Sequence, residues 1–237
     1  MKSRLHIVFL LLLVATFLTG CGGPRHNSVT QVATIGALLD GGYDGYMTCG
    51  ELTAQGGFGL GTFNRLDGEM VVLDGTVYQV KGNGTVSRPA QSVTVPFAMV
   101  VPFKQDIELK LTKGVDYERI KTIIDEAVPD KGLFCAIKVR GQFSVMKTRS
   151  VPAQDKPYPR LVEVVKHQSV FDLENVSGTI VGFRSPAYVK GGINVPGYHL
   201  HFISDDRTSG GHILAFETDR GTMQLDTCNR FVMMVRV

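Results

Sequence analysis

The segments Tyr198-His-Leu-His-Phe-Ile-Ser204 and His212-Ile-Leu-Ala-Phe-Glu217 lie on either side of a short polar connection that ends in two glycines. Both segments have the short, apolar or alternating pattern of β-strands. A connection of this length and composition joins neighbouring antiparallel strands. The sequence therefore predicts an antiparallel hairpin in the second half of the chain.

Three of the six histidines of the chain lie in this hairpin. Side chains two residues apart on a strand project from one face, so His199 and His201 point together. Pairing centred near Asp206 and Arg207 places His201 opposite His212, with Cβ atoms roughly 5 Å apart. This arrangement predicts a catalytic zinc site with an open fourth position, although imidazole also suits other first-row metals. The alternative is a solvated sheet face on which the histidines have no common ligand.

The rest of the chain reads as further short strands with a few short helices. Asp-Gly pairs at residues 67–68 and 74–75 predict an antiparallel meander from Phe58 to Val86. Helices are predicted at 29–39, after the capping box Thr48-Cys-Gly-Glu51, at 117–127 and at 160–167. Further strands are predicted at residues 92–101, 106–111, 133–139, 141–149, 177–183 and 223–237.

These elements predict an α+β fold of two mixed or antiparallel β-sheet subdomains, with the metal site on a hairpin of the second sheet. The Pro-rich stretch at residues 152–159 is the predicted boundary between them. The first subdomain then spans residues 31–151 and contains sheet and helices. The second spans residues 152–237 and contains the antiparallel sheet with the metal hairpin.

The N-terminus has the pattern of a bacterial lipoprotein signal. A positively charged start precedes an apolar stretch that ends in Leu18-Thr-Gly-Cys21, which resembles a lipobox. We expect a signal peptide at residues 1–20, then a lipidated Cys21 and a tether at residues 21–30. An ordinary secretory signal that ends near a cysteine is the alternative. The expected product is an exported lipoprotein on the periplasmic face or the cell surface, in contact with the membrane only through Cys21.

The charge and the cysteines exclude two classes of function. Cleavage before Cys21 leaves 23 basic and 22 acidic residues, a net charge near +1 that gives nucleic acid no long-range attraction. Cys49, Cys135 and Cys228 form no metal-spaced pair, so a thiolate zinc site is not expected. Isolated cysteines in apolar surroundings are commonly buried and free, and we predict no structural disulfide. One disulfide with one leftover thiol, formed in an oxidising compartment, is the alternative.

Three long motifs resemble those of α-acetolactate decarboxylases. The first is Gly197-Tyr-His-Leu-His-Phe-Ile-Ser-Asp-Asp206 with Gly210-Gly-His-Ile-Leu-Ala-Phe-Glu217, which is similar to the metal-binding hairpin of that family. Gly57-Phe-Gly-Leu-Gly-Thr-Phe-Asn-Arg-Leu-Asp-Gly-Glu-Met70 resembles its N-terminal signature, and Val145-Met-Lys-Thr-Arg-Ser-Val-Pro152 its central one. The resemblance runs from about Val32 to Val232.

The resemblance implies decarboxylation of 2-acetolactate (2-hydroxy-2-methyl-3-oxobutanoate) to acetoin and carbon dioxide. It implies Zn²⁺ bound at His199, His201 and His212, which as a Lewis acid would stabilise the enediolate left when carbon dioxide departs. The substrate is a small 2-hydroxy-3-oxo acid. By the same resemblance we expect a homodimer.

Three more residues fall on active-site positions of the family, namely Glu69, Arg149 and Thr62. The resemblance implies that Arg149 holds the substrate carboxylate and that Glu69 delivers or relays a proton. The sequence by itself allows exposed charges at Glu69 and Arg149 and a structural strand residue at Thr62. Glu51 is explained by its helix cap.

One departure from the family concerns a C-terminal extension that brings a second carboxylate towards the metal in some members. This chain ends at Val237, so Asp205 or Asp206 would substitute, the group is dispensable, or the site is altered. A non-catalytic metal- or ligand-binding lipoprotein with the same fold is therefore an alternative. A zinc hydrolase is another, which leaves Arg149 unexplained.

Overall fold

A computed structural model of the protein describes residues 26–235. The predicted signal peptide at residues 1–20 and the predicted lipid attachment at Cys21 lie outside the described residues. Within residues 26–235, no helix combines the length and the apolar character needed to cross a membrane.

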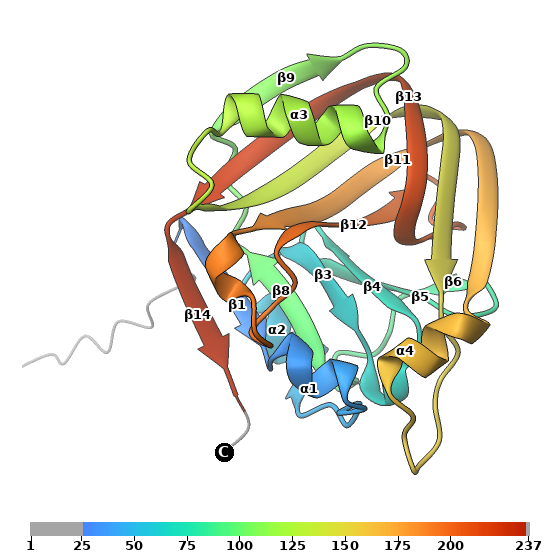
Figure 1. Ribbon diagram of the computed structural model, residues 1–237. Helices are drawn as coiled ribbons and strands as arrows, with labels where there is room; N and C mark the ends of the chain where they lie inside the picture. The colour runs from blue at the N-terminus through green and yellow to red at the C-terminus, as the bar shows by residue number, and fades with distance from the viewer. Residues whose placement is uncertain (1–25, 236–237) are drawn as a thin grey trace, which may run out of the picture.

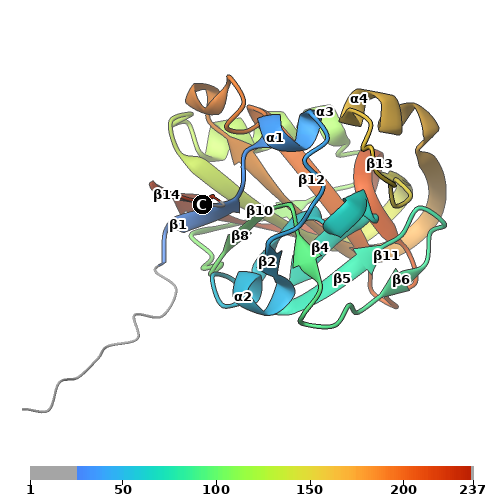
Figure 2. The same ribbon diagram turned by 90° about the horizontal axis from the view of Figure 1, so that it is seen from below.

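Seven strands form the first sheet, in the order β14-β1-β8-β3-β4-β5-β6. Their bounds are β1 (Ser28–Val32), β3 (Phe58–Thr62), β4 (Glu69–Leu73), β5 (Thr76–Val80), β6 (Val86–Ser87), β8 (Phe97–Val101) and β14 (Arg230–Met234). The run from β3 to β6 is the predicted antiparallel meander. β1 pairs in parallel with β14, which brings the first and last described strands side by side (Figure 2).

Five strands form the second sheet, in the order β10-β11-β12-β13-β9. Their bounds are β9 (Ile107–Leu111), β10 (Phe134–Ser150), β11 (Ser169–Ser185), β12 (Gly197–Ser204) and β13 (Gly210–Cys228). β10 also pairs with β13, so β10, β11, β12 and β13 form a closed ring of paired strands. Shifts in the β10–β13 register between residues 142 and 148 are irregularities of the kind that bend strands. In Figure 1 the long strands curve towards the first sheet, and the curve carries one end of each to that sheet.

The helices are short, apart from one. Their bounds are α1 (Ile35–Leu39), α2 (Cys49–Thr53), η1 (Asn64–Leu66), α3 (Tyr117–Ala127), α4 (Leu161–Val164), η2 (Val165–His167) and η3 (Ala187–Val189). A small pair of strands, β2 (Met47–Thr48) and β7 (Thr94–Val95), lies beside α2. In Figure 1 α3 lies across the outer face of the second sheet, and α1 and α4 lie at the opposite end of the molecule. The observed fold is thus mostly β-sheet with a few short helices, as predicted.

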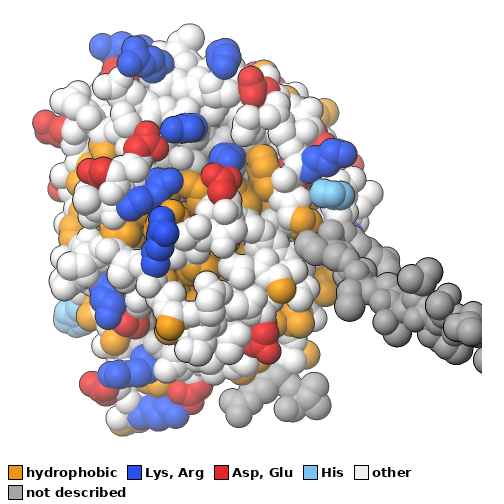
Figure 3. Space-filling model, turned by 180° about the vertical axis from the view of Figure 1, so that it is seen from behind, with side chains coloured by type: hydrophobic (Ala, Val, Ile, Leu, Met, Phe, Trp, Pro, Cys, Tyr) orange, Lys and Arg blue, Asp and Glu red, His pale blue; other side chains and the backbone are white. Residues whose placement is uncertain are grey.

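The core is divided among the layers. Leu60 of β3 and Phe183 of β11 belong to one buried cluster, which fills the space between the two sheets. Ile120 and Ile124 of α3 pack with Ile137 of β10 in a second cluster on the outer face of the second sheet. A third cluster lies between the first sheet and α2. On the face seen in Figure 3, positive and negative side chains are mixed rather than segregated.

The predicted helix at residues 29–39 is wrong in its first half. Ser28–Val32 is the strand β1, and α1 begins only after Thr34, whose hydroxyl accepts a hydrogen bond from the Ala37 amide. β1 lies between β8 and β14, and all five of its residues are buried. Two partner strands distant in sequence outweigh the local helical spacing that suggested the longer helix.

The two sheets do not divide at residues 151 and 152, where the boundary between subdomains was predicted. β9 and β10 precede that point but belong to the second sheet, and β14 follows it but belongs to the first. The Pro-rich stretch 152–159 is instead part of the connection between β10 and β11, two neighbouring strands of one sheet. Proline interrupts strand pairing both in a loop within one sheet and in a linker between subdomains. The Pro-rich stretch by itself therefore does not distinguish a loop from a linker.

Other local predictions are confirmed. α3 has the predicted bounds, Tyr117–Ala127, and the predicted capping box of Thr48 and Glu51 is present. The three cysteines of the described residues, Cys49, Cys135 and Cys228, are buried and free. The segments predicted as strands at 133–139 and 141–149 are one continuous strand, β10.

Candidate active site

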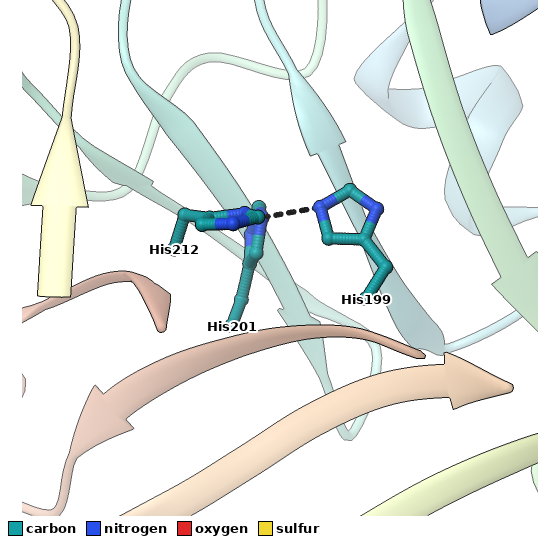
Figure 4. A group of neighbouring side chains, drawn as sticks. All are labelled: His199, His201 and His212. Carbon is teal, nitrogen blue, oxygen red and sulfur yellow. Dashed lines mark hydrogen bonds between the residues drawn. The ribbon is translucent and has the colours of Figure 1, made fainter. Parts of the chain in front are cut away.

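Three histidines lie on the hairpin of β12 and β13. His199 and His201 project from one face of β12, and His201 pairs directly with His212 on β13, as the turn register predicts. The Nε2 atoms of His199 and His201 are 3.1 Å apart. One ligand atom from each ring lies within 4.8 Å of the others. Figure 4 shows the three rings gathered around a common point.

The three imidazoles are neutral at neutral pH. Burial, together with the nearby charge of Arg149, lowers the pKa of His199 to about 4. Burial and the neighbouring His199 hold the pKa of His201 and of His212 well below the ordinary value. A neutral ring offers a nitrogen lone pair, which is the form in which histidine binds a metal. The donor set therefore fits a first-row metal ion such as zinc.

His201 is oriented by the first sheet. Its side chain is fully buried, and its Nδ1 lies 2.8 Å from the carbonyl oxygen of Met70 on β4. A carbonyl oxygen only accepts, so Nδ1 carries the hydrogen and Nε2 keeps its lone pair. Such a hydrogen bond to the second nitrogen fixes the tautomer and the ring orientation of metal-binding histidines. The site is thus built across both sheets.

Glu69 and Arg149 lie beside the histidines. Glu69 begins β4, and its Oε2 is 3.5 Å from His201 Nε2. Its Oε1 is 3.4 Å from Nη1 of Arg149, which pairs with His212 across β10 and β13. Burial raises the pKa of Glu69 to about 7, although the positive charge of Arg149 opposes this rise. Both predicted residues therefore meet the histidines in space.

Thr62 also reaches the site. It is the last residue of β3 and pairs with Glu69 of β4. Its hydroxyl donates a hydrogen bond of 2.7 Å to the carbonyl oxygen of Gly68. This hydrogen bond stabilises the connection between β3 and β4, directly before Glu69. Thr62 also lines the cavity in front of the histidines.

A cavity of about 310 Å³ opens in front of these residues. This volume lies at the lower end of the range typical of small-molecule sites, roughly 300–1,000 Å³. The polar residues that line it, called here the polar side, are Thr62, Glu69, Arg149, Tyr198, His199 and His212. The apolar residues that line it, called here the apolar side, are Ile35, Leu38, Leu39, Leu66, Phe97, Val151, Leu161 and Val195.

The sequence did not identify the apolar side of the cavity. The prediction for residues 29–39 gave a helix only, and an apolar residue such as Leu38 or Leu39 gives no local sign that it faces a ligand rather than a core. Leu39 is 40% exposed and Val195 is 53% exposed, and both line the cavity.

The carboxylates considered as substitutes for a C-terminal acid lie elsewhere. Asp206 is bonded within its own turn, to Ser204 and Thr208. Asp205 lines a different hollow of about 490 Å³, which contains none of the three histidines. Glu217 accepts a hydrogen bond from the Ser144 hydroxyl. Among residues 26–235, the carboxylate in contact with a histidine of the group is that of Glu69.

Residues 29–236 match the family model described as alpha-acetolactate decarboxylase. The alpha-acetolactate decarboxylase of Methanosarcina mazei is 49% identical over 203 residues, which cover 86% of this chain and 70% of that protein. The one from Bacillus subtilis strain 168 is 41% identical over 199 residues, which cover 84% of this chain and 78% of that protein. The chain belongs to the α-acetolactate decarboxylase family.

Solved structures agree with this membership of the α-acetolactate decarboxylase family. The crystal structure of the Bacillus subtilis strain 168 enzyme matches with a TM-score of 0.85 and 39% identity, and covers 88% of both chains. A Staphylococcus aureus protein of unknown function, described as similar to alpha-acetolactate decarboxylase, matches with a TM-score of 0.85 and 30% identity. That match covers 88% of this chain and 89% of the other. The resemblance inferred from the sequence motifs is confirmed.

Proposed function

We propose that the protein decarboxylates 2-acetolactate to acetoin and carbon dioxide. The observation that carries this proposal is the meeting of three neutral imidazoles, a guanidinium and a carboxyl group at a cavity whose other lining residues are mostly apolar. The names of the relatives support the identity of the substrate.

We infer that His199, His201 and His212 hold a zinc ion. When bound, zinc supplies a Lewis acid that withdraws electron density from the adjacent hydroxyl and carbonyl oxygens of the substrate. The three imidazoles are neutral, so they do not cancel the charge of the ion that they hold. The carbonyl oxygen of Met70 keeps the Nε2 lone pair of His201 directed at the site.

Arg149 is the group suited to binding the substrate carboxylate. Its side chain lines the cavity and is 17% exposed, so its charge is largely shielded from water. A guanidinium offers two parallel N–H donors to a carboxylate. Holding the carboxylate in this way orients the carbon–carbon bond that must break relative to the neighbouring carbonyl group.

Glu69 is the group suited to managing the proton. Loss of carbon dioxide breaks the bond between C1 and C2 and leaves its electron pair in an enediolate, which takes up one proton at C2 to give acetoin. Glu69 lines the cavity, 3.5 Å from His201. A carboxyl group fixed on one side of the substrate delivers its proton to one face only, which sets the configuration of the product.

The apolar side of the cavity completes the site. Leu38 of α1, Leu161 of α4 and Val195 line the same cavity as the polar groups. Apolar walls accommodate the two methyl groups of the substrate and exclude water. In a site with less water, the charges of Arg149 and of the bound metal act on the substrate more strongly.

The two alternative functions explain fewer of these residues. A zinc hydrolase would need the three histidines but gives no task to Arg149. A non-catalytic binding protein gives no task to Glu69. This side chain is buried, and burying a carboxyl group costs free energy. Decarboxylation of acetolactate gives a task to the three histidines, to Arg149 and to Glu69 together.

The test uses the purified protein with racemic 2-acetolactate. Acetoin formation is measured in the protein as purified, after metal removal with a chelator, and after zinc is restored. We expect acetoin above the spontaneous rate, loss of that activity on chelation, and recovery with zinc. Acetoin at the spontaneous rate in all three samples would overturn the proposal, and activity that survives complete metal removal would overturn its zinc dependence.

We also propose, from the sequence alone, that the protein is an exported lipoprotein anchored through Cys21 and that it is a homodimer. The mass of the N-terminal peptide from the membrane fraction tests the first statement, and an unmodified peptide that begins elsewhere would contradict it. Light scattering of the purified protein tests the second. A mass of one chain would contradict it.

A further inference from the structure

His199 lies in the less supported part of its strand. β12 pairs with β11 from Gly197 to Ser204, but its pairing with β13 covers only His201–Ile203. The stretch that contains His199 therefore has a strand partner on one side only. The hydrogen bond of its ring is to His201, another member of the same group, whereas His201 is fixed by a main-chain carbonyl group.

The neighbouring residue, Tyr198, is held from the opposite face of β12. Tyr198 is among the residues that line the cavity, but strand alternation sends its ring to the face of β12 opposite His199, towards α3, which lies across the outer face of the second sheet (Figure 1). Its hydroxyl lies 2.7 Å from Oδ1 of Asp125 and 3.0 Å from the carbonyl oxygen of Lys121, both on α3. The single hydroxyl hydrogen of Tyr198 is thus directed at two acceptors on the helix.

Asp125 is held in turn by Arg184. Nη1 of Arg184 donates to Asp125 Oδ1 at 3.0 Å and to the carbonyl oxygen of Val128 at 2.8 Å, and Nη2 donates to that of Asp130 at 2.8 Å. Arg184 is only 4% exposed and pairs with Tyr198 across β11 and β12. One buried guanidinium therefore joins the C-terminal end of α3 to the strand beside Tyr198.

The carboxylate at the centre of this network is charged at neutral pH. Partial burial by itself raises the pKa of Asp125, but hydrogen bonds from Lys131, Tyr198 and Arg184 outweigh that effect and lower the pKa to about 2. Hydrogen bonds to a charged acceptor are about twice as strong as those between neutral groups. The hydroxyl of Tyr198 is therefore firmly held.

We propose that Tyr198, Asp125 and Arg184 are positioning residues that hold His199 in place for metal binding. Tyr198 and His199 are consecutive and point to opposite faces, so a twist of β12 that moved one ring would move the other in the opposite direction. The hydrogen bonds of Tyr198 prevent this twist, which pairing with β11 alone does not prevent. The inference rests on the proposed metal site, since it concerns one of its ligands.

A purely structural role is the competing explanation, in which the network only fastens α3 to the sheet. The two explanations differ in what the Tyr198 hydroxyl affects. A structural fastening stabilises the fold whether or not a metal is present. A positioning network changes the affinity for zinc beyond any change in stability.

The decisive variant is Tyr198→Phe, which removes one hydroxyl and keeps the ring. Tyr46→Phe is the matched control, because the Tyr46 hydroxyl is also bonded to a main-chain oxygen, that of Met234 at 2.7 Å, but Tyr46 directly precedes β2 and Met234 lies on β14 of the first sheet. The zinc dissociation constant is measured by competition with a chelator, and thermal unfolding is measured on metal-free protein. We expect the constant to rise about tenfold in Tyr198→Phe, as is typical when support of a ligand is lost, and to stay unchanged in Tyr46→Phe.

A second variant, Asp125→Asn, keeps an acceptor oxygen for the Tyr198 hydroxyl but removes the charge, so we expect a smaller rise than in Tyr198→Phe. Lower thermal stability of Tyr198→Phe with an unchanged zinc dissociation constant would overturn the inference. A parent protein that binds no zinc would overturn both this inference and the proposed metal site. A parent protein that binds zinc but forms no acetoin would overturn only the proposed reaction.

Discussion

The two sides of the cavity are built from different kinds of structure. The polar side comes from strands, with Glu69 on β4, Arg149 on β10 and His212 on β13, whose backbones are fixed by pairing with neighbouring strands. Much of the apolar side comes from α1, α4 and a loop, and these helices have only five and four residues. Helices of that length are held by packing and not by their own hydrogen bonds.

The difference indicates which property each side controls. Groups that must meet a reacting atom within a few tenths of an ångström are carried by the rigid sheets, where a small displacement is costly. Groups that only fill space and exclude water are carried by elements that are able to adjust. Substitutions on the polar side should therefore affect metal binding, kcat or binding of the substrate carboxylate, and substitutions on the apolar side should affect KM without a large change in kcat.

The largest effect is expected for His201→Ala. This ring is fully buried, contacts His199 and Glu69, and is oriented by Met70. Loss of a ligand should lower zinc content to background and reduce acetoin formation by more than about 100-fold, since even loss of a ligand's supporting group costs 10–100-fold. Metal analysis and initial rates measure both. His167→Ala, a change at a histidine on η2, is the control, and undiminished zinc in His201→Ala would refute the ligand assignment.

Glu69→Gln should have the next largest effect. The substitution keeps the size of the side chain but removes the group that exchanges a proton, and general acid–base catalysis typically contributes about 10²–10⁴-fold. We expect kcat to fall by about 1,000-fold while zinc content stays unchanged. Loss of zinc together with activity would instead assign Glu69 to support of the metal site.

Arg149→Lys should have a smaller effect, because lysine keeps the positive charge and loses only the two-pronged geometry. We expect kcat/KM to fall by about 100-fold, mainly through a higher KM, which corresponds to roughly 3 kcal/mol. Steady-state kinetics with Arg220→Lys, an exposed arginine outside the cavity, provides the comparison. Activity within twofold of the parent would remove Arg149 from carboxylate binding.

Leu161→Ala should have the smallest effect and tests the apolar side. Loss of part of an apolar wall costs about 1 kcal/mol of substrate binding, so KM should rise about fivefold while kcat stays within twofold. Val162→Ala is the matched control, since Val162 is the next residue of α4 and is 55% exposed to solvent. A large fall in kcat for Leu161→Ala would contradict the division of tasks between the two sides.

The polar side of the cavity could be predicted from the sequence further than the apolar side. The meeting of His201 and His212 follows from strand periodicity and from the length of one connection, both of which are local. Glu69 and Arg149 were found through family motifs, because 80 residues separate them and no local rule places them together. Their encounter depends on register shifts that bend β10 against β13, and such shifts have no simple sequence signature.

The remaining errors have a common physical origin. Residues 29–32 form a strand because β8 and β14 pair with them, and the predicted boundary at residue 152 fails because β14 returns to the first sheet. Both depend on contacts between the start and the end of the chain. Strand alternation places Tyr198 on the face opposite His199, but its partner Asp125, and Arg184 that holds Asp125, lie on other elements distant in the sequence.

The parallel pairing of β1 with β14 has a consequence for biosynthesis. Residues 28–32 are synthesised long before one of their two partner strands, residues 230–234. One edge of β1 therefore stays unpaired while the intervening chain is synthesised, and unpaired strand edges are sites of aggregation. A nascent chain that stops before residue 230 cannot complete the first sheet, so this sheet is finished only after β14 has been made.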